Sequence, residues 1–120
     1  MEIKQFKKNE IIFEQGVYED CMYDIRWGKV GIYESYGKPE QQRLLRELGP
    51  EDVFGEMGLI EACPRSATAV CLEKDTQCAK ISRDDFSGYF KDKPTKILSI
   101  MQRMSQRIRD LSDEVARLSK

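Results

Sequence analysis

Alternating apolar and polar residues run through the first three quarters of the chain and predict short β-strands. Ile3 and Phe6 begin this pattern, and EIIFEQG continues it as far as Gly16. The segment CMYDIRWGKVGIYESYG alternates on both sides of Gly28, which predicts a β-hairpin with a tight turn at residues 28–29. RLLREL and ATAVCLEKDTQCAKIS add further strands, the latter around a polar turn at residues 73–76. Many short strands at this spacing favour a β-sandwich or barrel.

The last quarter of the chain changes to a helical period. Ser82, with Asp84 and Asp85 behind it, is typical of an N-cap and an acidic first turn, so a short helix should begin there. Pro94 after Lys93 should end that helix and suits the first turn of the next one. Apolar residues then recur with gaps of 4, 3, 4, 3, 4 and 3, an a/d heptad pattern held for three heptads. They are Ile97, Met101, Met104, Ile108, Leu111, Val115 and Leu118.

This apolar stripe has two interpretations. The helix would be roughly 36 Å long or more, and it could pack against the β-domain of its own chain. A strict two-in-seven stripe is narrower than the face usually buried on a core, so we favour a seam shared with a second copy. The expected homodimer interface is Met101, Met104, Ile108, Leu111, Val115 and Leu118. We therefore expect a β-barrel over residues 1–93 and a long amphipathic helix over residues 94–120.

Length, composition and charge narrow the class of protein. The 120 residues suit one core, and 40% hydrophobic with 34% charged residues indicates a globular chain. The net charge of −1 argues against a DNA-binding surface as the main feature. No apolar run approaches the ~18 residues of a membrane span, and MEIKQFKKNE lacks the apolar core of a signal peptide. A cytoplasmic protein without membrane contact is the expectation.

The cysteines and the lack of histidine restrict the chemistry further. Cys21, Cys63, Cys71 and Cys78 form no CxxC pair, and Cys71 and Cys78 lie in strand-like apolar contexts. We expect buried reduced thiols there and no metal site. The chain has no histidine, which removes the usual general base and the commonest metal ligand. The easiest enzymatic chemistry is thus excluded, and we expect a protein that is not an enzyme.

The segment FGEMGLIEACPRSATA, residues 54–69, concentrates candidate binding groups. A turn at Gly55 should lead into a short apolar helix at residues 57–60, whose unpaired N–H groups favour an anion. Arg65 after Pro64 could hold two phosphate oxygens in a fork, and Glu56 could accept hydrogen bonds from sugar hydroxyls. These groups together suit a sugar phosphate. The alternative is a Glu56–Arg65 ion pair on a surface turn, which contributes only ~0–1 kcal/mol.

The same segment closely resembles the phosphate-binding cassette of cyclic nucleotide-binding domains. The flanking segments YDIRWGKVGIY, LRELGPEDVFGE and CAKISRDDF agree with that family too, so the resemblance covers about residues 10–118. It implies a mainly β fold with C-terminal helices. That fold is an antiparallel double-stranded β-helix, or jelly-roll barrel, followed by a short helix and a long dimerisation helix.

The resemblance also implies roles for individual residues at the ligand's sugar and phosphate. Glu56 would accept a hydrogen bond from the ribose 2′-hydroxyl. Arg65 would pair with the cyclic phosphate, helped by the hydroxyl of Ser66. Backbone N–H groups would add to this contact near Gly55, Met57 and Gly58.

Further roles concern the base. Leu45 would lie against the base and Arg46 would reach its edge. By position in the bacterial regulator branch, Leu111 and Ser112 of the long helix would contact the purine, either within one chain or from the partner chain. Ser66 stands where a threonine often accompanies guanine, which favours cAMP over cGMP.

The chain departs from this family at both ends. Few residues precede the first strand, and the chain stops at Lys120, where bacterial regulators continue into a DNA-binding domain. We therefore expect a dimeric cyclic-nucleotide sensor without direct DNA binding, and no cofactor besides that ligand. The alternative is an interaction module of the same fold that binds another ligand or none.

Overall fold

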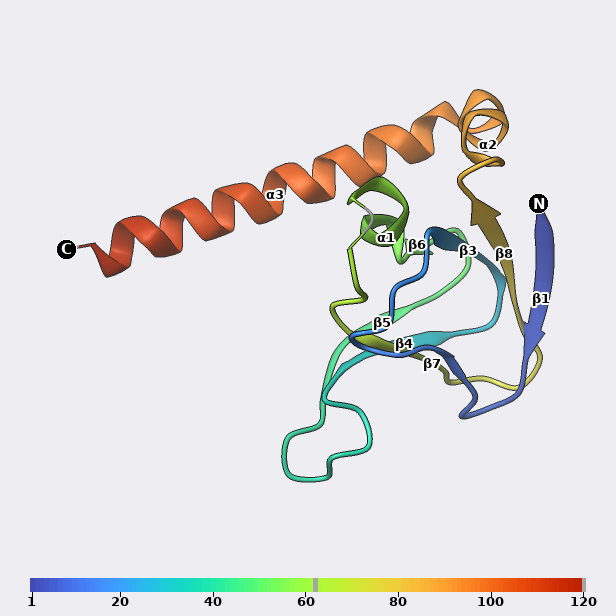
Figure 1. Cartoon of the computed structure of the whole chain (residues 1–120), viewed down its shortest axis with the longest axis horizontal. Helices are drawn as coiled ribbons and strands as arrows, with labels where there is room; N and C mark the ends of the chain where they lie inside the picture. Colours follow the sequence, from blue (N-terminus) through green and yellow to red (C-terminus); the bar gives the residue numbers. More distant parts are fainter. Residues whose placement is uncertain (62, 120) are drawn as a thin grey trace. The chain divides into compact units, whose positions relative to one another are not determined.

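The computed structural model describes residues 1–61 and 63–119. Ala62, inside the predicted cassette, and Lys120, at the end of the predicted long helix, lie outside the described residues. The chain divides into two compact units, Met1–Asp85 and Phe86–Lys120. The first unit holds the strands and the helix α1 (Glu56–Glu61), and the second holds α2 (Phe86–Asp92) and α3 (Pro94–Leu118), as labelled in Figure 1.

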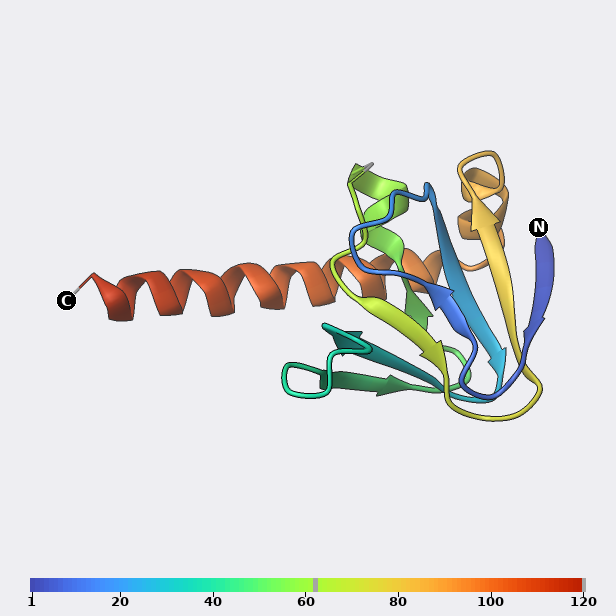
Figure 2. The ribbon, with the colours of Figure 1, turned by 60° about the horizontal axis from the view of Figure 1, so that its bottom comes forward.

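The strands of the first unit follow the predicted alternation closely. In chain order they are β1 (Glu2–Phe6), β2 (Ile11–Phe13), β3 (Cys21–Trp27), β4 (Val30–Glu34), β5 (Arg43–Leu48), β6 (Val53–Phe54), β7 (Thr68–Cys71) and β8 (Thr76–Ser82). They form two antiparallel sheets, with strand orders β1-β8-β3-β6 and β2-β7-β4-β5. Figure 2 shows these sheets as two separate layers. This arrangement confirms the predicted mainly β jelly roll with C-terminal helices.

The predicted hairpin around Gly28 is wrong, although both of its strands exist. Strand β3 pairs with β6 and β8, whereas β4 pairs with β5 and β7, so residues 28–29 carry the chain from one sheet to the other. Gly28 has φ +96°, and a Cβ there would lie 2.7 Å from the Cα of Thr76. The Lys29 N–H donates to the Thr76 hydroxyl at 3.2 Å. Alternation identified the strands but did not predict which strands pair.

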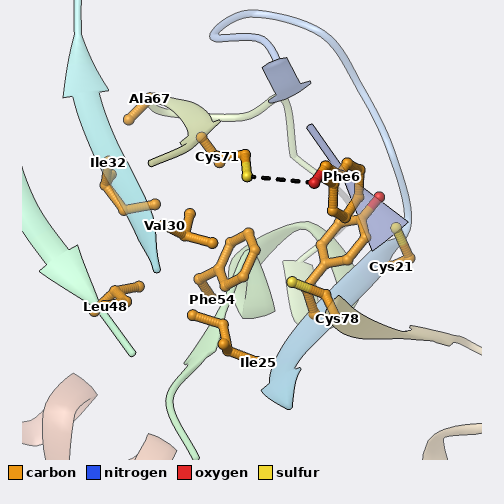
Figure 3. Close-up of a cluster of buried hydrophobic side chains, with 12 residues drawn as sticks. Phe6, Cys21, Ile25, Val30, Ile32, Leu48, Phe54, Ala67, Cys71 and Cys78 are labelled. Atoms are coloured by element: carbon orange, nitrogen blue, oxygen red, sulfur yellow. Dashed lines mark hydrogen bonds between the residues drawn. The ribbon is translucent and has the colours of Figure 1, made fainter. Parts of the chain in front are cut away.

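The core lies between the two sheets and takes side chains from both. Figure 3 shows the ring of Phe54 between Val30 and Ile25, so that residues from β6, β4 and β3 meet in one cluster. Phe13 of β2 packs on this cluster from the partly buried rim. Alternate residues of β3 and β4 belong to this cluster, although Cys21–Ile25 are all buried.

The first helix of the second unit begins later than predicted. Asp84 and Asp85 lie in the turn before α2, and no acidic residue stands in its first turn. The Asp85 carboxylate accepts hydrogen bonds from the N–H and the hydroxyl of Ser82, at 3.2 and 2.9 Å. These bonds close a turn at the end of β8, so Ser82 is not the N-cap and the helix begins at Phe86.

Helix α3 confirms the predicted long helix. It runs for 25 residues and has Pro94 at its first turn. Along its C-terminal half the heptad residues Ile108, Leu111, Val115 and Leu118 are 58–76% exposed. No helix among the described residues combines the length and the apolar character needed to cross a membrane.

Candidate functional site

The cassette is built from the end of a strand, a tight turn and a six-residue helix. Strand β6 ends at Phe54, and Gly55 follows with φ +75° before α1 begins at Glu56. A bulkier residue would be strained at that φ. Helix α1 buries Gly58 and Leu59, so the helix is stabilised by packing rather than by its own length.

The chain then returns past the loop that joins β2 to β3. The Arg65 N–H donates to the Val17 carbonyl at 2.9 Å, and the Gly16 N–H donates to the Arg65 carbonyl at 2.8 Å. Tyr18 and Pro64 form an isolated antiparallel β-bridge. The backbone of Arg65 is thereby fixed by residues about fifty positions earlier in the sequence.

The side chain of Arg65 is buried inside the cassette. The residue is 5% exposed, and its Nη1 donates to the Gly55 carbonyl at 2.6 Å. Its Nη2 donates to the Cys21 carbonyl at 2.8 Å and forms an ion pair with Glu19 Oε1 at 3.0 Å. The guanidinium carbon lies 4.2 Å from the centroid of the Phe13 ring, a cation–π contact. Arg65 therefore joins the cassette to β3 and to the β2–β3 loop.

Two glycines of the cassette make room for this guanidinium. A Cβ on Gly55 would lie 2.9 Å from Arg65 Nη1 and 3.1 Å from the Phe13 ring. A Cβ on Gly58 would lie 2.6 Å from the Glu19 carbonyl oxygen and would also collide with Arg65 Nη1. The sequence predicted a turn at Gly55 and a backbone N–H near it that helps to bind the phosphate. The structure shows that the missing side chains of both glycines leave the space that the Arg65 guanidinium occupies.

One donor of Arg65 has no acceptor among the described residues. Its Nε is buried and makes no hydrogen bond there. A buried donor without an acceptor costs about 1–3 kcal/mol, and native proteins rarely leave one unsatisfied. An anionic ligand at the cassette would supply the missing acceptor, so the donor set fits a phosphate.

Glu19 is a functional candidate that sequence reasoning missed. Its Oε1 accepts hydrogen bonds from Arg65 and from the Tyr23 hydroxyl, the latter at 3.2 Å. Burial raises the pKa of Glu19, but hydrogen bonds from Arg65 and Cys21, with the charges of Arg65 and Lys80, bring it below its usual value of 4.5. Glu19 stands 46 residues before Arg65, and no motif links them.

Phe13 was also missed as a site residue. Its ring lies 5.8 Å from that of Phe54 and 6.1 Å from that of Tyr23, so it is fixed between the core and Arg65. The sequence showed it only as an apolar residue of a short strand. Its cation–π contact places it beside the candidate phosphate position.

The predicted sugar-binding and hydroxyl residues lie at the two ends of the cassette. Glu56 is the first residue of α1, directly after Gly55, and is half-buried. Ser66 follows Arg65 and is exposed. Met57 and Gly58 continue α1. Because Arg65 is buried and paired with Glu19, the alternative of a Glu56–Arg65 pair on a surface turn does not describe this arginine.

The residues predicted near the base lie on β5. Arg46 stands opposite Ile32, Ile32 opposite Ala69, and Ala69 opposite Phe13. Arg46 therefore shares a cross-strand row with Phe13, three strand spacings or about 14 Å away. Leu45 is the extra residue at a bulge and has no partner in β4. The row links Arg46 to the cassette, whereas Leu45 takes no part in it.

Leu111 and Ser112 lie on α3 in the second unit, and Leu111 is 58% exposed. Their contact with a ligand remains a prediction.

The cysteines show buried free thiols at Cys21, Cys71 and Cys78, as predicted for the last two. Burial, with the nearby charge of Glu19, raises the pKa of Cys21 to about 11. Burial, with the charges of Cys71 and Asp24, raises the pKa of Cys78 to about 12. Residues 1–61 and 63–119 contain no group of three or more cysteine, aspartate or glutamate side chains arranged to hold a metal ion.

Comparisons with known proteins agree with this geometry. The family model described as "Cyclic nucleotide-binding domain" matches residues 3–93. The cyclic AMP receptor protein of Thermus thermophilus is 31% identical over 114 residues, which cover 95% of this chain and 52% of that protein. Human cGMP-dependent protein kinase 2 is 29% identical over 87 residues, which cover 72% of this chain and 11% of the kinase.

A solved structure shows the same fold. The crystal structure of the Thermus thermophilus catabolite activator protein superposes with a TM-score of 0.79 at 30% identity, covering 98% of this chain and 55% of that one. The chain thus spans about half the length of these bacterial relatives. Since the family model covers residues 3–93 of 120, the chain belongs to the cyclic nucleotide-binding domain family.

Proposed function

We propose that this chain is a non-enzymatic receptor domain for a 3′,5′-cyclic nucleotide. The observation that carries the proposal is the buried guanidinium of Arg65, whose Nε donor has no acceptor among the described residues although it lies within the cassette. A phosphate oxygen satisfies such a donor and balances the arginine charge.

The other cassette residues have complementary roles in this proposal. Gly55 and Gly58 hold open the space that Arg65 occupies. Glu56, at the start of α1, accepts from the ribose 2′-hydroxyl, and the exposed hydroxyl of Ser66 donates to the phosphate. Arg46 reaches the base from β5.

We propose cAMP as the preferred ligand because Ser66 occupies the position where a threonine accompanies guanine. The relatives include proteins named for cAMP and for cGMP, so the two nucleotides must be compared directly.

The output of the receptor is proposed to run through a homodimer. The apolar stripe of α3 from Ile108 to Leu118 is exposed and keeps heptad spacing over its length, as a coiled-coil seam requires. The net charge of −1 is unfavourable for direct DNA binding by this chain. We propose that the receptor acts in the cytoplasm.

A second candidate follows from the bonds that Arg65 already makes. Three residues, Gly55, Cys21 and Glu19, accept hydrogen bonds from its terminal nitrogens. An interaction module that uses Arg65 only to join its loops would show the same three bonds and would bind another ligand or none.

Isothermal titration of the purified chain with cAMP and cGMP separates the two candidates. The receptor should bind cAMP more tightly than cGMP, and Arg65→Ala should lose at least about tenfold in affinity because a charge-assisted bond is removed. Arg65→Lys should also bind weakly, since lysine keeps the charge without the fork.

Arg43→Ala is the matched control, because Arg43 is exposed and paired with Glu34 at 3.0 Å. It should bind like the unaltered chain. No heat with any 3′,5′-cyclic nucleotide up to millimolar concentration would rule out the receptor and leave the interaction module.

A further inference from the structure

The hydrogen bonds of Arg65 leave little room for a phosphate fork. A guanidinium has five N–H groups, of which Nε carries one and each terminal nitrogen two. Nη2 donates to the Cys21 carbonyl and to Glu19 and has a longer contact of 3.5 Å with the Cys21 sulfur, and Nη1 donates to the Gly55 carbonyl. Nε alone among the three nitrogens makes no bond to the described residues. A phosphate that binds through two neighbouring nitrogens must therefore use one that already serves a protein acceptor.

The three oxygen acceptors differ in how readily they can be replaced. The carbonyls of Cys21 and Gly55 belong to the backbone, at the start of β3 and directly after β6. The carboxylate of Glu19 is a side-chain group from the β2–β3 loop, and it is 33% exposed while the Arg65 side chain is 2% exposed. Glu19 is thus the acceptor that can turn away while the backbone stays in place.

Charge favours the same exchange. A phosphate at Arg65 would bring a second anion to a guanidinium that already has a carboxylate 3.0 Å away. Two anions at one buried cation repel each other, and the repulsion is weakly screened there. Binding of the phosphate is therefore opposed as long as the Glu19 carboxylate remains.

We propose that Glu19 is an internal counter-anion that competes with the ligand's phosphate for Arg65. This inference rests on the proposed function, and it adds that Glu19 regulates the affinity of the site. The carboxylate stabilises Arg65 before the ligand binds, and the phosphate displaces it. Glu19 is a positioning residue whose removal should favour the bound state.

The test compares Glu19→Gln with Asp20→Asn. Glutamine keeps the length of the side chain and can still accept from Tyr23, but it lacks the charge. Asp20 is the neighbouring acid and lies 3.9 Å from Arg83, so its variant removes a charge outside the Arg65 contacts. Glu19→Gln should bind cAMP about tenfold more tightly than the unaltered chain, because a charged hydrogen bond need no longer be broken. Asp20→Asn should leave the affinity within about twofold. Equal or weaker binding by Glu19→Gln would overturn the proposal.

A second readout needs no nucleotide binding. Thermal melting is followed in sodium phosphate and in sodium chloride of equal ionic strength. Inorganic phosphate should raise the melting temperature of Glu19→Gln more than that of the unaltered chain, since the guanidinium of the variant lacks its carboxylate. If neither chain binds any cyclic nucleotide but this difference appears, the proposed function fails while Glu19 still competes with phosphate. If the unaltered chain binds cAMP but the difference is absent and the affinities are equal, only the competition fails.

A measurement on the unaltered chain covers the case in which Glu19→Gln does not fold. The side-chain carboxyl carbon of Glu19 is followed by NMR during acid titration, with and without saturating cAMP. Displacement from Arg65 by a phosphate should raise the pKa of Glu19 toward or above its usual value of 4.5. A pKa that stays low in the complex would show that Glu19 keeps its bond to Arg65, which contradicts the exchange.

Discussion

Replacing Gly58 by alanine tests the packing of Arg65 against α1. Gly58 is buried in the middle of that helix. An added Cβ would lie 2.6 Å from the Glu19 carbonyl oxygen and 3.1 Å from Arg65 Cζ. The carbonyl is backbone and cannot turn aside, and the guanidinium is held by three protein acceptors. The added methyl must therefore displace either the helix or Arg65.

The sign of the effect follows from two opposing contributions. In an open helix, glycine to alanine stabilises by about 0.5–1 kcal/mol through backbone entropy. An extra methyl in a packed interior destabilises by about 1–3 kcal/mol. The overpacking contribution should dominate at Gly58, so we expect the free energy of unfolding to fall by about 1–2 kcal/mol. Ligand affinity should fall as well, since Arg65 loses its place.

Urea unfolding followed by circular dichroism, with titration of cAMP on the same preparations, measures both effects. Gly88→Ala in α2 is the matched control, because a Cβ there meets nothing within 4 Å. That variant should be as stable as the unaltered chain or more stable. A Gly58→Ala variant with unchanged stability and unchanged affinity would refute the close approach of Arg65 to α1.

Three further predictions concern acid stability, thiol reactivity and assembly. Burial raises the pKa of Glu19, but its hydrogen bonds to Arg65 and Cys21 outweigh burial and lower the pKa below 4.5. The charged carboxylate therefore stabilises the fold above pH 4.5, and this contribution is lost as the pH falls through the lowered pKa. Acid unfolding curves should show this loss in the unaltered chain and not in Glu19→Gln. Cys63 should react first with a thiol reagent, because it is half-buried while the other three cysteines are buried. Rapid reaction of a second thiol in the native protein would contradict the structure. Leu111→Asp should make the chain monomeric in light scattering, because it places a charge in the apolar seam between the two copies. Gln106→Glu, which lies off the heptad stripe, should leave the assembly unchanged. A fully dimeric Leu111→Asp variant would refute the proposed seam along α3.

Much of the candidate site could be found in the sequence because its parts are contiguous. Gly55, Glu56 and Arg65 fall within sixteen residues whose order resembles a known cassette. An acid, an arginine and unpaired backbone N–H groups already indicated a sugar phosphate. The family match over residues 3–93 agrees with that prediction.

The partners of Arg65 could not be predicted in the same way. Glu19 and Phe13 come from segments about fifty residues earlier, and neither differs in its local pattern from other acids or aromatic residues of the chain. Only the closing of the β2–β3 loop over the cassette, through the backbone bonds of Arg65, brings them together. A contact of this kind depends on long-range packing and leaves no periodic signal.

The sequence by itself determined the elements of this protein: short strands from alternation, a long helix from the heptad spacing, and a cassette from its residue order. Those features depend on neighbours within a few positions, which a linear pattern records. The tertiary structure alone decided that the strands on either side of Gly28 belong to different sheets, and that Arg65 is buried against Glu19. Both depend on which distant segments meet, and that choice is made by the packing of the whole domain.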